Sequence, residues 1–217
     1  VAGEILGRGI NAIAESAIPF DAEVSLVGAR GRDGRCVFYR LTENLHRNGI
    51  LTISISRDTG MNHLQQRAEA MLSTLLHHLD YVGVMAMECF VQGDTLLVNE
   101  LAPRVHNSGH WTQDGASISQ FELHLRALQG LPLPAPEQTG TTLMVNLLGM
   151  EYDPAWLQVA GARLYWYGKP YQPGRKMGHI NLHHPDTGKI IGWLQQLALP
   201  ADYQDSLAWA LRRLANA

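Results

Sequence analysis

Two apolar, strand-like runs joined by a turn constrain this sequence more than any other feature. The first, Gly83–Val91, carries Glu88 near its end, and the second ends at Glu100. The residues between them, Gln92-Gly93-Asp94, are typical of a tight turn, so the two runs are predicted to pair as a β-hairpin. A pivot near Asp94 would place Glu88 directly opposite Glu100.

The predicted pair of facing carboxylates needs a positive partner. Like charges opposite each other across a ladder repel, and an unpaired charge at the end of an apolar run is costly to bury. Two interpretations stay open on these residues alone. The glutamates form salt bridges with Arg104 and a lysine, or they hold a hard divalent cation such as Mg²⁺, whose ligands are oxygens completed by phosphate and water.

Composition indicates an ordinary globular protein and excludes some partners. The chain has 217 residues, of which 46% are hydrophobic and 17% charged, enough for one large or two small domains. A net charge of −3 gives no overall basic field for nucleic acid or an anionic membrane, and no apolar run is long enough to cross one. Cys36 and Cys89 lie in strand-like segments without metal-ligand spacing, which predicts free thiols and a cytoplasmic protein.

The periodicity predicts an α+β fold. Three strands are expected before the first helix, and the helix itself is predicted by apolar residues at helical spacing. After the hairpin a second helix is expected, with Ser117 as N-cap and Gln120 three residues later. The predicted strands are 23–30, 36–39, 50–56, 163–167 and 176–182, and the predicted helices are 62–79, 117–129, 189–197 and 202–214.

A proline-rich segment predicts a domain boundary. Pro132, Pro134 and Pro136 cannot continue a helix or a central strand, so we expect domains at 1–135 and 136–217. Strand 141–148 is assigned to the second domain or returns to the first.

Three motifs carry a resemblance to a known family. They are Met87-Glu-Cys-Phe90, Asn99-Glu-Leu-Ala-Pro-Arg-Val-His-Asn-Ser-Gly-His-Trp-Thr112 and Pro173-Gly-Arg-Lys-Met-Gly-His-Ile180. Together they resemble the 5-(carboxyamino)imidazole ribonucleotide synthase family, ATP-grasp enzymes of bacterial and fungal purine biosynthesis. The resemblance implies the second half of an ATP-grasp domain, an antiparallel sheet with helices, followed by a small C-terminal α/β domain.

The resemblance also implies a reaction and a metal site. Family members convert ATP, bicarbonate and 5-aminoimidazole ribonucleotide into ADP, phosphate and the N-carboxylated ribonucleotide through carboxyphosphate. Glu88 and Glu100 match the family's Mg²⁺ ligands. Other ATP-grasp enzymes often carry asparagine where this chain has Ala102, which leaves the two glutamates, water and phosphate to coordinate the ion.

The loop after Glu100 matches the part of the family's site that faces bicarbonate and carboxyphosphate. The planar guanidinium of Arg104 could bind an oxyanion through two N–H groups, and Asn107 could orient a carboxylate. His106 could donate a hydrogen bond to that carboxylate or transfer a proton. His106 and His110 also have the spacing of a zinc pair, but no third ligand lies nearby in the sequence.

Nucleotide and substrate contacts are implied on both sides of this loop. Glu15-Ser16-Ala17-Ile18 resembles the hinge that reads adenine, Glu23 matches the carboxylate for the ribose hydroxyls, and His46 and Asn99 match nucleotide contacts. Lys169, Arg175 and Lys176 surround a proline-framed turn that suits the phosphate of the ribonucleotide, or else form a solvated basic loop. Tyr165-Trp166-Tyr167 could stack on a base or alternate between core and surface.

Relative to the family, about one further domain is missing from this sequence. It has no glycine-rich phosphate loop and no amino-terminal substrate-binding domain, and it begins at Val1, so we expect a fragment with little activity on its own. A homodimer is the expected assembly. Two alternatives are a formate-dependent ATP-grasp transformylase of the same pathway and a nucleotide-binding remnant without catalysis.

Overall fold

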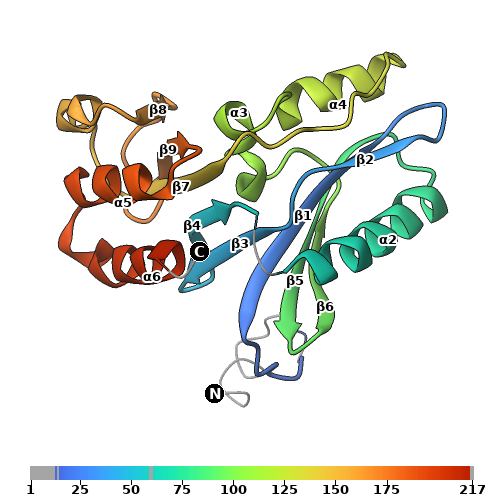
Figure 1. Ribbon diagram of the computed structural model, residues 1–217, viewed down its shortest axis with the longest axis horizontal. Helices are drawn as coiled ribbons and strands as arrows, with labels where there is room; N and C mark the ends of the chain where they lie inside the picture. The colour runs from blue at the N-terminus through green and yellow to red at the C-terminus, as the bar shows by residue number, and fades with distance from the viewer. Residues whose placement is uncertain (1–12, 14, 59–60, 216–217) are drawn as a thin grey trace.

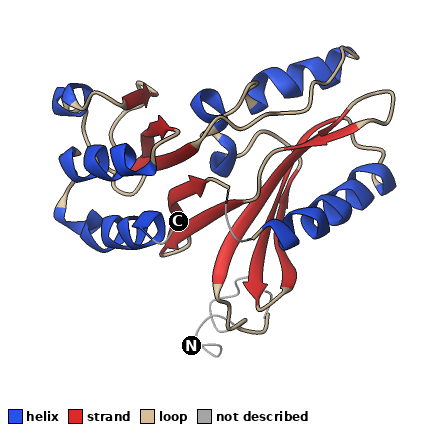
Figure 2. Cartoon of the chain, in the orientation of Figure 1, coloured by secondary structure: helices blue, strands red, loops and turns tan. Residues whose placement is uncertain are grey.

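A computed structural model describes residues 13, 15–58 and 61–215. Within this part, nine strands form a single antiparallel sheet in the order β6-β5-β1-β3-β4-β7-β9-β8, with β2 paired to β1. Helices lie against both faces of the sheet (Figures 1 and 2). The fold is therefore an antiparallel α+β architecture, as the sequence predicted. Val1, on which the expectation of a fragment partly depends, lies outside the described residues.

The strands are β1 (Ala22–Arg30), β2 (Cys36–Phe38), β3 (Thr42–Arg47), β4 (Ile50–Ser56), β5 (Gly83–Gln92), β6 (Thr95–Ala102), β7 (Thr141–Leu148), β8 (Ala162–Trp166) and β9 (Lys176–His184). The α-helices are α2 (Asn62–His78), α3 (Thr112–Gly115), α4 (Gln120–Gln129), α5 (Thr187–Gln196) and α6 (Gln204–Ala215). Short 3-10 turns are η1 (Asn107–Gly109), η2 (Pro154–Gln158) and η3 (Ala201–Tyr203).

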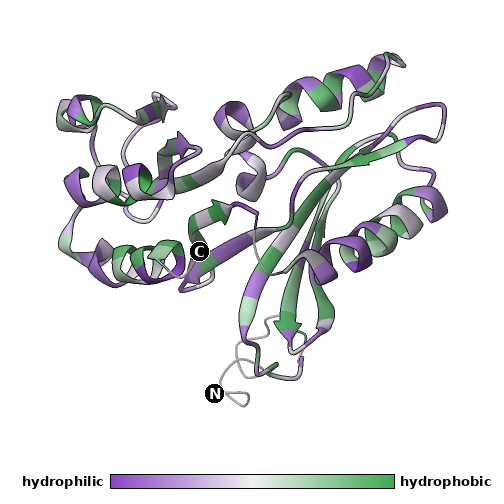
Figure 3. Cartoon of the chain, in the orientation of Figure 1, coloured by the Kyte–Doolittle hydropathy of each residue, from purple (hydrophilic) through white to green (hydrophobic). Residues whose placement is uncertain are grey.

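Strand β1 shows how the sheet separates two cores. Because successive side chains of a strand point to opposite faces, Val24 and Leu26 pack with α2, whereas Val27 and Ala29 pack on the other face with Leu123 of α4. In Figure 3 the strands β1, β5 and β6 are largely apolar in colour, while much of α2 is coloured hydrophilic. The central strands are thus buried on both faces.

A third core lies under α5 and α6. Alternate residues of β4, β7 and β9, among them Ile53, Val145 and Ile180, pack against Ile190 of α5 and Leu214 of α6. Strand β7 pairs with β4 on one side and β9 on the other, so the sheet passes without interruption between the two expected domains. The boundary at residue 135 stays a prediction.

Two local expectations were wrong. Four strands, not three, precede the first described helix, because Thr42–Arg47 also forms a strand, β3. Helix α4 is capped by Ser119, whose hydroxyl accepts from the Glu122 N–H, rather than by Ser117. Ser117 instead accepts from the Glu137 N–H. None of the helices in the described part of the chain combines the length and apolar composition that crossing a bilayer requires.

Candidate active site

The β5/β6 hairpin brings the two predicted carboxylates together. Glu88 of β5 pairs directly with Glu100 of β6, as the sequence predicted. The pairing runs regularly from the turn to Cys89 and Val98, and then a β-bulge at Asn99 shifts the register by one residue. The bulge leaves Glu100, rather than Asn99, opposite Glu88.

The two carboxylates have different surroundings. Glu88 is buried and Glu100 is exposed. Burial raises the pKa of Glu88; the charge of His46 lowers it in part, and the charges of Glu100 and Glu23 raise it further. Glu88 Oε1 is buried without a hydrogen-bond partner. An unpaired carboxylate oxygen facing a second carboxylate suits a bound cation.

His46 links these carboxylates to Glu23. Its Nδ1 lies 3.2 Å from Glu23 Oε1, its Nε2 lies 3.8 Å from Glu88 Oε2, and its backbone N–H donates to Glu23 Oε2. Burial alone would lower the pKa of His46, but the hydrogen bond and charge of Glu23, with the charges of Glu88 and Glu100, raise it overall. His46 and Glu23 therefore lie beside the carboxylate pair.

The described residues offer no ready-made metal centre of side chains alone. No group of three or more His, Cys, Asp or Glu residues in the described ranges has the arrangement of a metal site. The zinc interpretation of His106 and His110 gains no support, since each ring uses its Nδ1 in a contact with Ser108 or Gln120. An ion at Glu88 and Glu100 would need ligands from substrate and water.

The loop after β6 carries the predicted residues Arg104 and His106, of which His106 lies near Glu88. Arg104 is exposed, and its Nη1 donates to the neighbouring Val105 carbonyl. His106 Nδ1 lies 3.7 Å from Glu88 Oε1 and 2.9 Å from Ser108 Oγ. Burial, then the charges of Arg104, His46 and Lys176, lower the pKa of His106 to about 4, so the ring is neutral at pH 7.

Lys176 joins this loop from the other end of the sheet. Its Nζ contacts Asn107 Oδ1, which connects β9 to η1. Burial, and then the charge of Lys169, lower the pKa of Lys176 to about 7. Of the three cations expected on the basic turn, Lys176 thus contacts the loop after β6, whereas Lys169 is exposed and Arg175 donates to the Pro170 carbonyl.

The predicted hinge lines a hollow of about 660 Å³ at the other end of the hairpin. This volume is within the range of small-molecule sites. The rings of Phe20 and Phe90 stack beside it, 4.7 Å apart and 15° from parallel. Its walls are Glu15, Ser16, Ala17, Ile18, Phe20, Phe90, Leu97, Val98 and Asn99. Five predicted nucleotide residues therefore lie together, whereas Glu23 and His46 belong to the carboxylate cluster.

Comparison with known proteins gives the family. The ATP-grasp domain matches residues 2–121, and the phosphoribosylaminoimidazole carboxylase C-terminal domain matches residues 142–191. The chain belongs to the ATP-grasp family. It is 55% identical over 206 residues to N5-carboxyaminoimidazole ribonucleotide synthase of Haemophilus influenzae, covering 93% of this chain and 57% of the relative. The resemblance read from the motifs is confirmed.

Solved structures agree with this assignment. The N5-carboxyaminoimidazole ribonucleotide synthetase of Thermus thermophilus superposes with a TM-score of 0.81 at 50% identity, covering 85% of this chain and 52% of that one. The Aspergillus clavatus synthase, in complex with ADP and 5-aminoimidazole ribonucleotide, has a TM-score of 0.72 at 28% identity, covering 87% and 52%. This ATP-grasp chain therefore spans about half the length of the relatives it matches.

The structure gives contacts for Tyr165 and Tyr167, which the sequence predicted to stack on a base or to alternate between core and surface. Tyr167 lies under both lysines, with Lys169 Nζ 5.0 Å and Lys176 Nζ 5.6 Å from its ring centroid. The Tyr167 hydroxyl lies 2.7 Å from Nδ1 of the buried His179, whose ring stacks on Tyr165. Both tyrosines therefore contact His179 of β9. In the sequence, the three consecutive aromatic residues Tyr165-Trp166-Tyr167 are the feature that could have pointed to these contacts.

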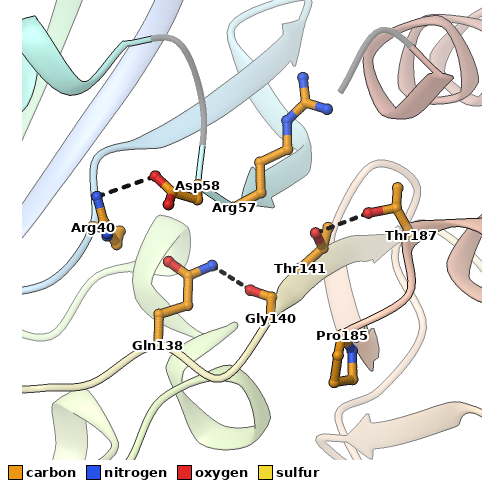
Figure 4. Close-up of a pocket in the computed structure, with 8 residues that line it drawn as sticks. All are labelled: Arg40, Arg57, Asp58, Gln138, Gly140, Thr141, Pro185 and Thr187. Carbon is orange, nitrogen blue, oxygen red and sulfur yellow. Dashed lines mark hydrogen bonds and ion pairs between the residues drawn. The ribbon is translucent and has the colours of Figure 1, made fainter.

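A smaller hollow of about 240 Å³ lies beside the start of β7 (Figure 4). Arg40 pairs with Asp58 at 3.4 Å, and the Thr141 and Thr187 hydroxyls lie 3.1 Å apart. The Arg57 guanidinium points away from the other labelled side chains. None of the predicted site residues lines this hollow, whose walls are Arg40, Arg57, Asp58, Gln138, Gly140, Thr141, Pro185 and Thr187.

Proposed function

We propose that this chain supplies one wall of the active site of an ATP-dependent carboxylating ligase acting on 5-aminoimidazole ribonucleotide. The observation that carries the proposal is the convergence of the Glu88/Glu100 pair with His106, Asn107 and Lys176. Such a site combines a place for a divalent cation with neutral and cationic donors for an oxyanion. The 55% identity to the Haemophilus influenzae synthase supports the choice of reaction.

The first step joins two anions. A bicarbonate oxygen attacks the γ-phosphorus of ATP, and the bond from that phosphorus to the β,γ-bridging oxygen breaks. The products of this step are ADP and carboxyphosphate. Positioning and charge neutralisation are the main needs of phosphoryl transfer. Glu88 and Glu100 would hold Mg²⁺, which would supply positive charge against the phosphates. Arg104 and Lys176 bring positive charge to the same region.

The second step moves the carboxyl group. The exocyclic amine of the ribonucleotide attacks the carboxyl carbon, the carbon–oxygen bond to phosphate breaks, and the departing phosphate can take the amine proton. Asn107 and His106 would orient the carboxyl oxygens. Lys169 and Arg175, on the more exposed side of the turn, would bind the phosphate of the ribonucleotide.

Nucleotide binding is proposed at the hollow beside Glu15–Ile18. Backbone groups of this segment would meet the adenine edge, and the stacked Phe20 and Phe90 would form an apolar wall. Glu23 would accept hydrogen bonds from the ribose hydroxyls. Its carboxylate would then have to give up part of its contact with His46.

A chimera tests the proposal. The part of the Haemophilus influenzae relative that this chain does not cover would be joined to it, and ADP release would be measured with ATP, ribonucleotide and bicarbonate. We expect turnover that requires both bicarbonate and ribonucleotide. Formate in place of bicarbonate distinguishes the transformylase alternative. Nucleotide binding without turnover would favour a non-catalytic remnant and contradict the proposal.

Matched variants locate the activity. Glu88→Gln in the chimera should abolish turnover, whereas Glu151→Gln, at an exposed position outside the site, should leave it unchanged. The chain alone is expected to show little turnover, since its relatives are about twice as long.

A further inference from the structure

Gln120, the first residue of α4, holds the loop that follows the carboxylates. Its side chain is fully buried. Oε1 accepts from the His106 N–H at 2.9 Å, and Nε2 donates to the His106 carbonyl at 2.7 Å. The same Nε2 lies 2.8 Å from His110 Nδ1. The Gln120 amide therefore bonds to both backbone groups of His106 and also contacts the His110 ring.

These contacts assign the proton of His110. A backbone N–H can only donate and a backbone carbonyl can only accept, so the two contacts with His106 fix which end of the Gln120 amide is oxygen and which is nitrogen. The amide nitrogen then donates its second hydrogen to His110 Nδ1. A neutral imidazole that accepts at Nδ1 carries its proton on Nε2.

The protonated nitrogen is open to a ligand. Among the described residues His110 Nε2 has no hydrogen-bond partner, whereas Nδ1 is held by Gln120. The rings of His179 and Phe121 lie 5.0 Å and 5.3 Å from the His110 ring and limit its movement. Lys176 is close enough for its charge to act on His110.

A chain of buried hydrogen bonds holds the backbone of the same loop. Thr112 Oγ1 donates to the Gly109 carbonyl at 2.6 Å and accepts from the Gln120 N–H at 3.0 Å. Asn181 Nδ2 donates to the His110 carbonyl at 3.2 Å. Gly109 leaves room for Gln120, because a Cβ at this position would lie 2.5 Å from Gln120 Oε1. His110 is thus fixed both at its ring and at its backbone.

We infer that His110 donates a hydrogen bond through Nε2–H, as a neutral imidazole, to an oxygen of bound bicarbonate or carboxyphosphate, and that Gln120 positions it. The inference rests on the proposed function for the identity of the anion. A fixed neutral donor stabilises charge on an oxygen without losing its proton to it. Lys176, whose charge acts on His110, adds positive charge beside this neutral donor.

The tautomer can be measured on this chain without any activity. In a sample with ¹⁵N-labelled histidine rings, long-range ¹H–¹⁵N correlation spectra distinguish Nδ1–H, Nε2–H and imidazolium forms. We expect His110 to show the Nε2–H form at pH 7, and its Nε2 signal to shift when bicarbonate is added. The exposed His78 on α2 is the control and should not shift. An Nδ1–H form, or no bicarbonate response of His110, would overturn the inference.

Gln120→Glu tests the positioning residue. A carboxylate accepts but cannot donate, so it should draw a proton to His110 Nδ1 and change the tautomer or produce the imidazolium form. An unchanged Nε2–H signal in a folded Gln120→Glu protein would show that Gln120 does not set the tautomer. If this variant does not fold, the wild-type spectrum still decides the tautomer.

Turnover in the chimera provides the second measurement. His110→Leu removes the donor and should lower kcat about a hundredfold, the usual effect of losing one oxyanion donor. His110→Gln keeps an N–H donor and should recover part of that loss. An inactive wild-type chimera would count against the proposed function and leave the tautomer result standing. An active chimera in which His110→Leu is as fast as wild type would refute the role of His110.

Discussion

Glu88 and Glu100 face each other across the β5/β6 hairpin because the bulge at Asn99 shifts the register by one residue. A regular ladder continued from Gln92 and Thr95 would place Asn99 opposite Glu88 and turn Glu100 to the other face of the sheet. The same bulge places Asn99 at the wall of the hollow beside Glu15–Ile18. One extra residue therefore serves both the proposed metal ligands and the proposed nucleotide site.

Neutralising Glu88 should stabilise the chain in the absence of metal. Glu88 is buried, faces Glu100 and lies near Glu23, so Glu88→Gln removes repulsion at a functional site. We expect a gain of about 1 kcal/mol in the free energy of unfolding, together with loss of Mg²⁺-dependent nucleotide binding. Urea unfolding and calorimetric titration with Mg²⁺ and ADP measure the two effects. A variant that is less stable than wild type would show that repulsion does not dominate at this position.

Mild acid should destabilise the fold through buried neutral histidines. Burial is the largest cause of the lowered pKa values of His106, His110 and His179, which are about 4, 2 and 3. The unfolded chain binds protons at these groups near pH 6.5, whereas the folded chain does not. Stability is therefore fully present above pH 6.5 and falls as the pH decreases, by roughly 4 kcal/mol per pH unit when all three contribute.

Urea midpoints between pH 7.5 and about 5 check this slope, and His179→Gln should reduce it by about a third. His46 provides a control of opposite sign, since its pKa is raised in the folded state. Its contribution is present below the unfolded pKa and is lost as the pH rises through the higher folded value. His46→Gln should therefore lose stability at acid pH relative to wild type. Equal acid slopes in wild type and His179→Gln would contradict the assignment.

Lys176 should titrate close to neutrality. Burial, aided by Lys169, lowers its pKa to about 7, so about half of the Lys176 amines are neutral at that pH. The chain has three lysines, Lys169, Lys176 and Lys189, which makes the measurement simple. After ¹³C reductive methylation, which labels the three lysines and the amino terminus, one lysine resonance should move near pH 7. Lys176→Arg identifies that resonance by removing it and so separates it from the signal of the amino terminus. A Lys176 resonance that moves only above pH 9 would refute the prediction.

The C-terminal helix should depend on an ion pair with β3. Arg213 Nε of α6 lies 2.8 Å from Oε1 of the buried Glu43, and burial raises the pKa of Glu43 while Arg213 and then Arg57 lower it. Removing Arg213 leaves a buried carboxylate with Arg57 as the remaining charged neighbour. We expect Arg213→Leu to cost about 2 to 3 kcal/mol in urea unfolding.

The double variant Glu43→Gln/Arg213→Leu tests the cause. It should recover much of the lost stability, because no buried charge is left unpaired. The substitution Arg212→Leu, one position away and outside this pair, is the matched control and should change stability by less than about 0.5 kcal/mol. Additive losses in the double variant would show that the pair is not coupled.

The elements that the sequence predicted well have strong periodicity. Helix α2 and the β5/β6 hairpin repeat apolar residues at clear spacings, and each buries those residues against the sheet. Strand β3 was missed because Thr42–Arg47 contains Glu43, Asn44 and His46. These polar residues are tolerated in a central strand only because tertiary partners satisfy them: Asn44 bonds to Ser25 and Ser54, and Glu43 pairs with Arg213.

The sequence by itself determined the carboxylate hairpin, the loop that follows it and the family, because these depend on local turn chemistry and on short contiguous motifs. Only the tertiary structure decided that Lys176 contacts Asn107, that His46 lies between Glu23 and Glu88, and that Gln120 fixes the proton of His110. Each of these contacts joins residues on different elements. Their distances and burial, and hence their pKa values and tautomers, follow from the packing of the sheet and cannot be read from spacing along the chain.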